Sequence, residues 1–299
     1  MNDDVPNDLW YDRMQTLGIL ILRKMLSHAL LPAGSYLAWK DMVERMIFDT
    51  HAHYMDDRFA EDREELLASL HDAGVGNVVE VGASIQSTKD AVALSRKYDF
   101  VYGAVGVHPD GVPEMTEETI EWLKELTGEP KVVAIGEIGL DYYYDEPERE
   151  LQKKWFIRQL EAAKETKMPV IIHSRDAAQD TLQIMEEHCD WSQGGVIHCF
   201  SYTVETARIY LKKGFYLGIG GVVTFKNGRK LVEVVKEAPL EQLVLETDSP
   251  YLTPVPNRGK RNDSRQLTYV VDAIAQIKGI DREEVIRVTE ENAKRMYRL

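Results

Sequence analysis

The chain has 299 residues, of which 44% are hydrophobic and 29% charged, the ordinary balance of a globular protein. That balance excludes a disordered, collagen-like or low-complexity chain. Lys and Arg number 36 against 50 Asp and Glu, and the formal net charge of −14 excludes a protein that coats DNA through broad positive charge. Two cysteines, Cys189 and Cys199, are too few for a disulfide framework, so we expect a cytoplasmic protein.

Residues 1–45 carry no metal-ligand or phosphate-binding pattern, and we expect them to lie outside the main folded unit of residues 46–299. Residues 17–31 are apolar enough to form a helix, which the following proline would end. The acidic start differs from a secretory signal, and the apolar run is too short to span a membrane. Three interpretations stay open: a start codon assigned upstream of Met46, a helix packed on the folded unit, or a weak membrane-surface anchor. We expect no stable membrane association.

From residue 46 onward, eight short apolar runs alternate with longer segments of helical periodicity. Continuous apolar strands separated by helices are typical of a parallel sheet covered on its faces. Eight such units in a chain of this length predict a TIM-like (β/α)8 barrel. The alternative is an open doubly wound sheet, although no glycine-rich dinucleotide fingerprint follows the first strand. The predicted strands are residues 47–51, 77–81, 101–105, 132–136, 170–173, 195–198, 215–219 and 243–246.

Helices are predicted over residues 62–73 and 148–166, where apolar residues recur at helical spacing. Two more helices are expected after residue 264. The second of these is predicted to begin with a capping box formed by Asp281 and Glu284.

Five of the eight predicted strands end in or before residues that can bind a metal. His51 and His53 are two residues apart and therefore point to the same face of an extended strand. In a barrel, the C-terminal strand ends converge on the face where barrel enzymes carry out their chemistry. Four imidazoles and two carboxylates at one rim predict a metal site, because such neighbours would be costly without a shared cation. The candidate ligands are His51, His53, Glu137, His173, His198 and Asp248.

Other polar residues near this rim have more than one interpretation. His108 follows the third strand and is predicted to contact substrate or transfer a proton, with a role in shaping the loop as the alternative. Cys199 directly follows His198, so in a strand its side chain would point to the opposite face, and it is expected to lie in the core. The tyrosines at 142–144 are expected to pack at the rim, and stacking on a base is the alternative.

Basic side chains from loops at the same rim are candidates for holding phosphate oxygens, with solvated surface charge as the alternative for each. Their local positive charge would let an acidic protein bind a polyanion over a small footprint. These residues are Arg175, Arg258, Lys260 and Arg261.

Five motifs together resemble the TatD-type metal-dependent hydrolases. They are IFDTHAH from residue 47, GEIGLDY from 136, PVIIHSRDA from 169, LETDSPYL from 245 and RGKRN from 258. The resemblance extends from Met46 to the C-terminus and implies a barrel of the amidohydrolase superfamily. It also implies a metal-dependent deoxyribonuclease, often a 3′→5′ exonuclease on single strands.

Carried over residue by residue, the resemblance implies two divalent cations. His51, His53, Glu137 and Asp248 would hold one cation, and Glu137, His173 and His198 the other, so that Glu137 bridges them. The cations could be Mg, Mn, Zn, Co or Ni. Two departures from the family pattern are visible. Asp110 stands where the family often has a histidine, which is expected to alter substrate contacts, and Asn262-Asp263-Ser264 replaces Asn-Glu-Pro, which is expected to leave the metal site untouched.

The resulting hypothesis is hydrolysis of single-stranded DNA, with RNA as a further substrate, by a hydroxide held on two cations. Asp248 would accept the proton of the attacking water while also binding a cation, and Glu137 would fix the spacing of the cations. The alternative is another hydrolase of the superfamily, acting on a small amide, lactone or phosphoester. Many of those use a carboxylated lysine where this chain has Glu137, which favours the TatD type. A barrel that only binds partners is disfavoured by the complete ligand set, and no obligatory protein partner is evident.

Overall fold

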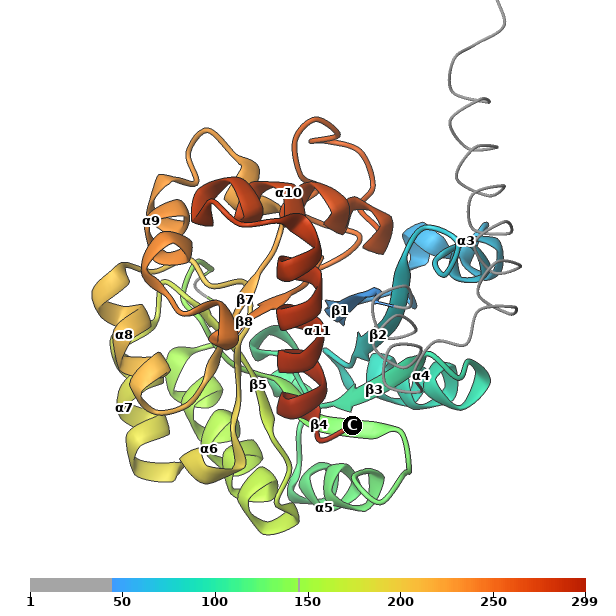
Figure 1. Cartoon of the computed structure of the whole chain (residues 1–299). Helices are drawn as coiled ribbons and strands as arrows, with labels where there is room; N and C mark the ends of the chain where they lie inside the picture. The colour runs from blue at the N-terminus through green and yellow to red at the C-terminus, as the bar shows by residue number, and fades with distance from the viewer. Residues whose placement is uncertain (1–44, 145) are drawn as a thin grey trace, which may run out of the picture. The chain divides into compact units, whose positions relative to one another are not determined.

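The computed structural model describes residues 45–144 and 146–299, and Figure 1 shows their arrangement. Met46–Leu299 form one compact unit. The predictions made for the N-terminal segment, including a helix over residues 17–31, lie outside the described residues. Among the helices of the described part, none is both long and apolar enough to cross a membrane.

Eight parallel strands form one sheet in the order β1 to β8, each paired with the next strand along the chain. A parallel bridge between Ala52 and Ser249 joins the end of β1 to the segment after β8 and nearly closes the ring. The predicted TIM-like barrel is confirmed, and the open sheet is excluded. The strands are β1 (Ile47–Ala52), β2 (Val75–Val81), β3 (Val101–Val105), β4 (Val132–Asp141), β5 (Val170–Arg175), β6 (Gly195–Ile197), β7 (Tyr216–Ile219) and β8 (Leu243–Leu245).

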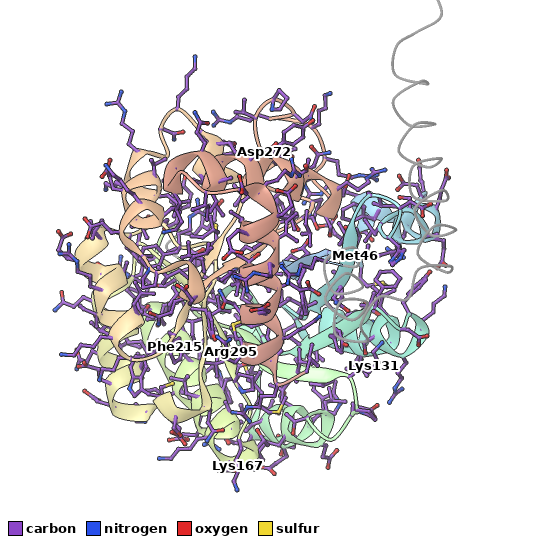
Figure 2. All side chains as sticks on the ribbon, in the orientation of Figure 1. Met46, Lys131, Lys167, Phe215, Asp272 and Arg295 are labelled. Atoms are coloured by element: carbon purple, nitrogen blue, oxygen red, sulfur yellow. The ribbon has the colours of Figure 1, made fainter. Side chains whose placement is uncertain are left out.

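The helices surround this sheet, as Figure 1 shows, and α10 and α11 come last in the chain. Figure 2 adds the described side chains, and many of those at the periphery project outward and end in nitrogen or oxygen atoms. The helices are α3 (Arg63–Ser69), α4 (Ile85–Lys97), α5 (Glu117–Leu126), α6 (Arg149–Thr166), α7 (Ala178–His188), α8 (Val204–Lys212), α9 (Arg229–Glu237), α10 (Leu267–Lys278) and α11 (Arg282–Tyr297).

Two buried apolar clusters lie on the two faces of the strands, because successive residues of a strand point to opposite sides. In β2, Val78 packs in the larger cluster with the helices, whereas Val79 packs in a second cluster with Phe48 and Tyr297. The rings of Phe48 and Tyr297 lie 6.2 Å apart, and the Tyr297 hydroxyl donates to the Thr50 carbonyl at 3.0 Å. Helix α11 therefore packs where β1 begins, and the polar residues gather at the opposite end of the barrel.

Strand β4 is longer than the sequence predicted. The prediction ended at residue 136, but the strand continues to Asp141, so that Glu137 lies inside it. The strand continues because Ile138 and Leu140 still bury their side chains, and because β5 provides backbone partners for Gly139 and Leu140. This extension carries acidic side chains along the wall of the barrel mouth.

The predicted helices are present, but one predicted boundary and the predicted capping box differ from the structure. Helix α3 ends at Ser69, four residues before the predicted end at residue 73. Helix α11 follows Asp281 as predicted, but the predicted capping box is wrong, because the Asp281 side chain accepts no cap hydrogen bond. Glu284 accepts a hydrogen bond from Arg287 Nε at 2.7 Å. Its negative charge in the first turn still interacts favourably with the positive end of the helix dipole.

Candidate metal centre

Five of the six predicted ligands lie around the sixth, the buried carboxylate of Glu137, whose two oxygens face different histidines. Oε2 lies 3.4 Å from His51 Nε2 and 3.9 Å from His53 Nε2. Oε1 lies 2.6 Å from His173 Nδ1 and 3.7 Å from His198 Nε2. One carboxylate at the middle of β4 thus separates His51 and His53, at the end of β1, from His173 in β5 and His198 just after β6.

Asp248 lies beside the first of these pairs. Its Oδ1 is 3.5 Å from His53 Nε2, 4.0 Å from His51 Nε2 and 3.8 Å from His198 Nε2. The ligand atoms of His51, His53 and Asp248 all lie within 4.8 Å of one another, and so do those of His51, Glu137 and His198. The sheet order explains this proximity, because β8 lies next to β1 in the nearly closed ring.

Hydrogen bonds at the outer ring nitrogens fix the tautomers of two histidines. His53 Nδ1 lies 2.9 Å from the Val81 carbonyl oxygen, which can only accept, so Nδ1 carries the proton. His198 Nδ1 lies 3.1 Å from Glu246 Oε2 and likewise donates to it. In their neutral forms both rings therefore point the lone pair of Nε2 into the cluster. Metal-binding histidines have this arrangement of an outer partner and an inward lone pair.

His173 and His51 also fit a bound cation. The outer Nε2 of His173 lies 3.1 Å from Asp141 Oδ2, which leaves the Nδ1 lone pair facing Glu137. The Nε2 atoms of His51 and His53 lie only 3.1 Å apart. The lone pairs of His51 and His53 repel each other at that separation. The Nδ1 lone pair of His173 likewise repels the Glu137 carboxylate. A positive charge between the two partners removes the repulsion in each case. The donor set of nitrogen and carboxylate oxygen suits divalent transition metals.

Protons provide that positive charge in the metal-free protein. Burial alone would lower the pKa of His53, but hydrogen bonding and attraction to Asp248 raise it to about 9. Burial is likewise outweighed at His173, where Glu137 and Asp141 raise the pKa to about 10. Burial would raise the pKa of Glu137, yet the surrounding imidazolium groups hold it well below its usual range. Ionised carboxylates and protonated imidazoles therefore share this space at neutral pH.

His108 lies at the edge of the same cluster. Its ring meets that of His173 edge to face, with centroids 4.3 Å apart, and its Nδ1 accepts the backbone N–H of Asp110 at 3.2 Å. Burial, and then repulsion from His173, lower the pKa of His108 to about 3. Its ring is therefore neutral, with the proton on Nε2. Its ligand atom lies within 4.8 Å of those of Glu137 and His173, so His108 is also within reach of a cation.

Buried acidic residues behind the ligands were missed by the sequence analysis. Glu80 in β2 accepts the backbone N–H groups of Tyr54 and Met55 at 2.7 and 2.9 Å, and Glu246 after β8 holds His198. Burial raises the pKa of Glu80 to about 7. A signal was present, because Glu80 interrupts an apolar strand run and Glu246 directly follows one, and an unpaired charge at either place would be costly.

Asp49 in β1 is a third buried acid and connects two ligand-bearing segments. Its carboxylate accepts the backbone N–H of His51 at 3.2 Å, and both the backbone N–H and the hydroxyl of Thr247 at 3.0 and 2.7 Å. Burial raises the pKa of Asp49 to about 7. Ser264 Oγ donates to the same carboxylate at 2.6 Å. The departure from the family pattern at Ser264 therefore contacts no ligand, but it reaches the network that supports His51.

The prediction that Cys199 points into the core is wrong. Its side chain is only partly buried, and its thiol lies within 4.8 Å of ligand atoms of His198 and Glu246. Strand β6 ends at Ile197, so the alternation of a strand does not extend to Cys199. The backbone also turns there, with φ at 45°.

The four basic rim residues have different environments. The guanidinium of Arg175 lies 3.8 Å from the ring centroid of Tyr143, and that of Arg258 lies 4.3 Å from the ring of Phe225. Lys260 donates to the Asn257 side chain at 3.2 Å. The fourth residue, Arg261, makes two hydrogen bonds to the Asp62 carboxylate at 2.8 and 2.6 Å, which compensates its charge.

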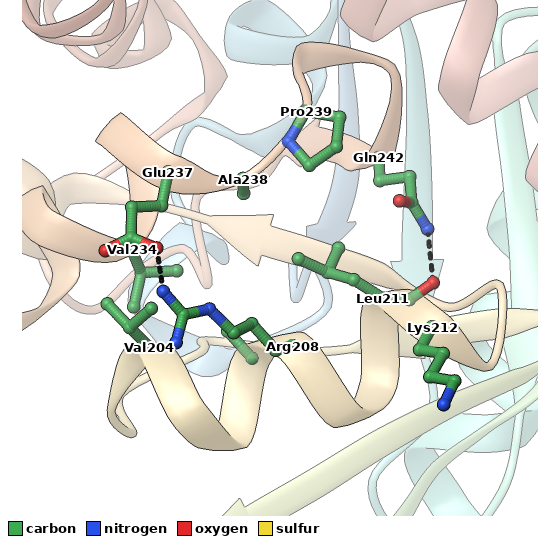
Figure 3. Close-up of a pocket in the computed structure, with 10 residues that line it drawn as sticks. Val204, Arg208, Leu211, Lys212, Val234, Glu237, Ala238, Pro239 and Gln242 are labelled. Carbon is green, nitrogen blue, oxygen red and sulfur yellow. Dashed lines mark hydrogen bonds and ion pairs between the residues drawn. The ribbon is translucent and has the colours of Figure 1, made fainter.

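A separate pocket of about 280 Å³ lies between α8 and α9 on the outside of the barrel (Figure 3). Leu211, Val234 and Pro239 line it, and Arg208 pairs with Glu237 at its edge. It contains none of the predicted ligands. The candidate metal centre is therefore a different place on the molecule.

Comparison with known proteins identifies the family of this chain. The family described as TatD related DNase matches residues 48–298. An uncharacterised metal-dependent hydrolase, YabD of Bacillus subtilis (strain 168), is 45% identical over 254 residues, which cover 85% of this chain and all of that protein. A protein named 3′-5′ ssDNA/RNA exonuclease TatD, from Escherichia coli (strain K12), is 34% identical over 257 residues, or 84% of this chain and 98% of that protein.

A solved structure of a TatD homologue also resembles this chain. The crystal structure of YJJV, a TatD homologue from Escherichia coli K12, superposes with a TM-score of 0.81 at 29% identity, covering 86% of this chain and 99% of that one. The family match extends over nearly all of the barrel, and the relatives are covered almost completely. The chain belongs to the TatD-related DNase family and is a metal-dependent hydrolase.

Proposed function

We propose that the protein is a nuclease that removes nucleotides from the 3′ ends of single-stranded DNA and RNA at a centre of two divalent cations. The observation that carries this proposal is the orientation of Glu137, whose Oε2 faces His51 and whose Oε1 faces His173. A carboxylate between two sets of nitrogen ligands suits a pair of cations about 3.5–4 Å apart, the spacing that clamps a phosphate during hydrolysis. The name of the E. coli TatD relative supports the substrate class.

Each cation would have its own ligand set. His51, His53 and Asp248 would hold the first cation together with Glu137 Oε2. His173 and His198 would hold the second together with Glu137 Oε1. When bound, the pair would neutralise phosphate charge and make an attacking water more acidic.

Asp248 is the better placed of the two carboxylates to accept the proton of the attacking water. Its side chain is 21% exposed, whereas that of Glu137 is 5% exposed and surrounded by imidazoles. Burial would raise the pKa of Asp248, but its hydrogen bond with His53 lowers the pKa overall. Asp248 is therefore ionised at neutral pH and open to a water, which a general base requires.

His108 would act as a hydrogen-bond donor. The backbone N–H of Asp110 occupies its Nδ1, so the neutral ring offers the N–H of Nε2 to a ligand in the site. That group could hold a phosphate oxygen or support the leaving oxygen. If Nε2 instead binds the second cation through a lone pair, Nδ1 must carry the proton and its hydrogen bond with Asp110 must break. The tautomer therefore favours the substrate role.

Arg175, Arg258 and Lys260 would hold phosphate oxygens of the strand near the site. A net charge of −14 opposes binding of a polyanion elsewhere on the protein. We therefore expect a footprint of only a few nucleotides.

The proposal is tested by a substrate panel with protein loaded separately with Mg²⁺, Mn²⁺ and Zn²⁺. The panel contains single-stranded DNA and RNA labelled at the 3′ or the 5′ end, the matching duplex, a small amide, a lactone and a phosphotriester. We expect immediate release of the 3′ label as mononucleotide and slow hydrolysis of the duplex. The Asp248→Asn variant, purified in parallel, controls for contaminating nucleases. Hydrolysis of only the amide, the lactone or the phosphotriester would overturn the proposal in favour of a small-molecule hydrolase.

A further inference from the structure

Exposed tyrosines gather at the mouth of the metal centre. Among the described residues, seven large hydrophobic side chains are strongly exposed, and three of them are tyrosines in the loops after β4 and β8. These are Tyr143, Tyr144 and Tyr251, of which Tyr143 is 57% exposed and Tyr251 is 48% exposed. Their rings are large apolar surfaces left in water beside a polar site, which is typical of a binding surface.

The first tyrosine is held in a fixed orientation next to one half of the cluster. The Arg175 guanidinium covers one face of Tyr143 at 3.8 Å from the ring centroid, and Tyr144 meets the ring edge on at 4.8 Å. The backbone N–H of Tyr143 donates to Asp141 Oδ1 at 2.9 Å, and Asp141 Oδ2 accepts from His173. Tyr143 is therefore joined to the ligands of the second cation through a single carboxylate.

The second tyrosine has a matching arrangement at the other half of the cluster. The Arg58 guanidinium lies 4.0 Å from the ring centroid of Tyr251, and Asp56 fixes Arg58 through two hydrogen bonds of 3.0 and 3.2 Å. The backbone N–H of Tyr251 donates to the carbonyl of Asp248 at 2.9 Å. Tyr251 is therefore joined to a ligand of the first cation.

The two tyrosine–arginine pairs lie on opposite walls of the barrel. Tyr143 and Arg175 come from the ends of β4 and β5, whereas Tyr251 and Arg58 follow β8 and β1. In a ring ordered β1 to β8, these two places are half a turn apart. Eight tilted strands about 4.8 Å apart give a ring roughly 15 Å across. The metal ligands lie between the two walls.

We propose that the two pairs bind the bases on either side of the phosphate that is cleaved, Tyr143 with Arg175 on one wall and Tyr251 with Arg58 on the other. This inference rests on the proposed nuclease function and deepens it. Each arginine covers one face of its tyrosine, which leaves the other face for an incoming base. Stacking on aromatic rings is tolerant of sequence because every base has a flat face.

The distance between the walls would account for the preference for single strands that we propose. Stacked bases in a duplex follow one another every ~3.4 Å, much less than the width of the ring. Neighbouring bases can occupy both tyrosines only when they are unstacked and splayed apart. A duplex must therefore open its end before it fits, and a single strand need not.

The inference is tested by binding measurements that need no hydrolysis. Fluorescence anisotropy with Mn²⁺-loaded protein compares a 5′-labelled single strand carrying phosphorothioate linkages with strands that are abasic at the terminal or the penultimate 3′ position. We expect each abasic position to weaken binding about tenfold. Tyr143→Leu should remove the effect of one abasic position, and Tyr251→Leu should remove the effect of the other.

Matched variants separate stacking from general surface effects. Tyr143→Phe and Tyr251→Phe keep the ring and should bind like the wild type. Ile209→Ala removes an exposed apolar side chain from α8, away from the mouth, and should change nothing. On unmodified strands, the leucine variants should raise KM and leave kcat within about twofold, because the chemistry does not involve the rings.

The outcomes distinguish this inference from the proposed function. Base-dependent binding without hydrolysis of any strand supports the two platforms and contradicts the nuclease. Hydrolysis with equal binding of normal and abasic strands supports the nuclease and overturns the platforms. If the loss of binding free energy caused by a leucine substitution simply adds to the loss caused by an abasic position, the ring and the base act independently. That result would also overturn the platforms.

Discussion

Nδ1 of His198 donates a hydrogen bond to Oε2 of Glu246 across 3.1 Å, and both side chains are buried. The bond joins the end of β6 to the end of β8 and turns Nε2 of His198 toward the metal centre. A carboxylate partner also makes the imidazole a stronger ligand. Glu246 would thus position His198, a proposed metal ligand, through its outer ring nitrogen.

The Glu246→Gln variant should bind metal about 10–100-fold more weakly, because the amide keeps the shape of the side chain but loses its charge. Titration of the metal-free protein with Zn²⁺ against a competing chelator measures this affinity. Glu241→Gln, an exposed change just before β8, is the matched control. Equal affinity in the two variants would show that the Glu246 charge does not act on His198.

Replacement of the proposed general base should abolish catalysis without unfolding the protein. Asp248→Asn is expected to lower kcat by roughly 10²–10⁴-fold, the usual contribution of general base catalysis. His51→Ala and His173→Ala should also remove hydrolysis, because each deletes a ligand. Circular dichroism checks the fold, and the exposed change Asp72→Asn serves as control. Near-wild-type turnover by folded Asp248→Asn would exclude Asp248 as the base.

The metal-free protein should lose stability as the pH rises from 7 to 10. The folded-state pKa values of His53, His173 and His198 are raised to about 9, 10 and 9. A raised histidine pKa contributes stability that is complete below the unfolded value near 6.5 and is lost as the pH rises through the folded value. Burial raises the pKa values of Asp49 and Glu80 to about 7. These two carboxyl groups therefore also reduce the stability of the folded protein as the pH rises, but they do so below pH 7.

Urea unfolding in EDTA at several pH values measures this loss. In the metal-loaded protein, the cations replace the protons on the three histidines, so the decrease between pH 7 and 10 should be much smaller. An unfolding midpoint in EDTA that stays constant or rises over this range is incompatible with the charge balance described for the cluster.

The basic loop after β8 should contribute to binding by neutralising phosphates. Arg258→Ala with Lys260→Ala should reduce the slope of log K against log salt by about 0.7 for each phosphate of a single strand that the loop no longer neutralises. Adding Arg261→Ala should change the slope little further, because Asp62 already compensates that charge. Lys230→Ala on α9 is the control. An unchanged slope in the double variant places the loop outside the path of the substrate.

The sequence predicted the barrel and the convergence of the ligands because both follow from simple periodicity. Apolar runs define parallel strands, and strand ends in a barrel meet at one face. His51 and His53 could be placed together from a spacing of two residues alone. The extent of β4 could not be predicted in the same way, because Glu137 interrupts the apolar run that marks the strand.

Interactions between residues distant in the sequence were beyond this kind of prediction. Arg261 looked free in the sequence, but it lies against Asp62 near the opposite end of the chain. Cys199 was misplaced because strand alternation was extended beyond the end of β6. The buried acid Glu246 was visible directly after an apolar strand run, but nothing local identified His198 as its partner, since 48 positions separate the two residues.

The bridging role of Glu137 is the central claim, and electron paramagnetic resonance of the Mn²⁺-loaded protein tests it most directly. Two Mn²⁺ ions held about 3.5–4 Å apart by one carboxylate should give an exchange-coupled spectrum with two metals per chain. Glu137→Gln should lose about one metal per chain and most activity, and its spectrum should become that of isolated Mn²⁺. A coupled spectrum and two tightly held metals in Glu137→Gln would contradict the account.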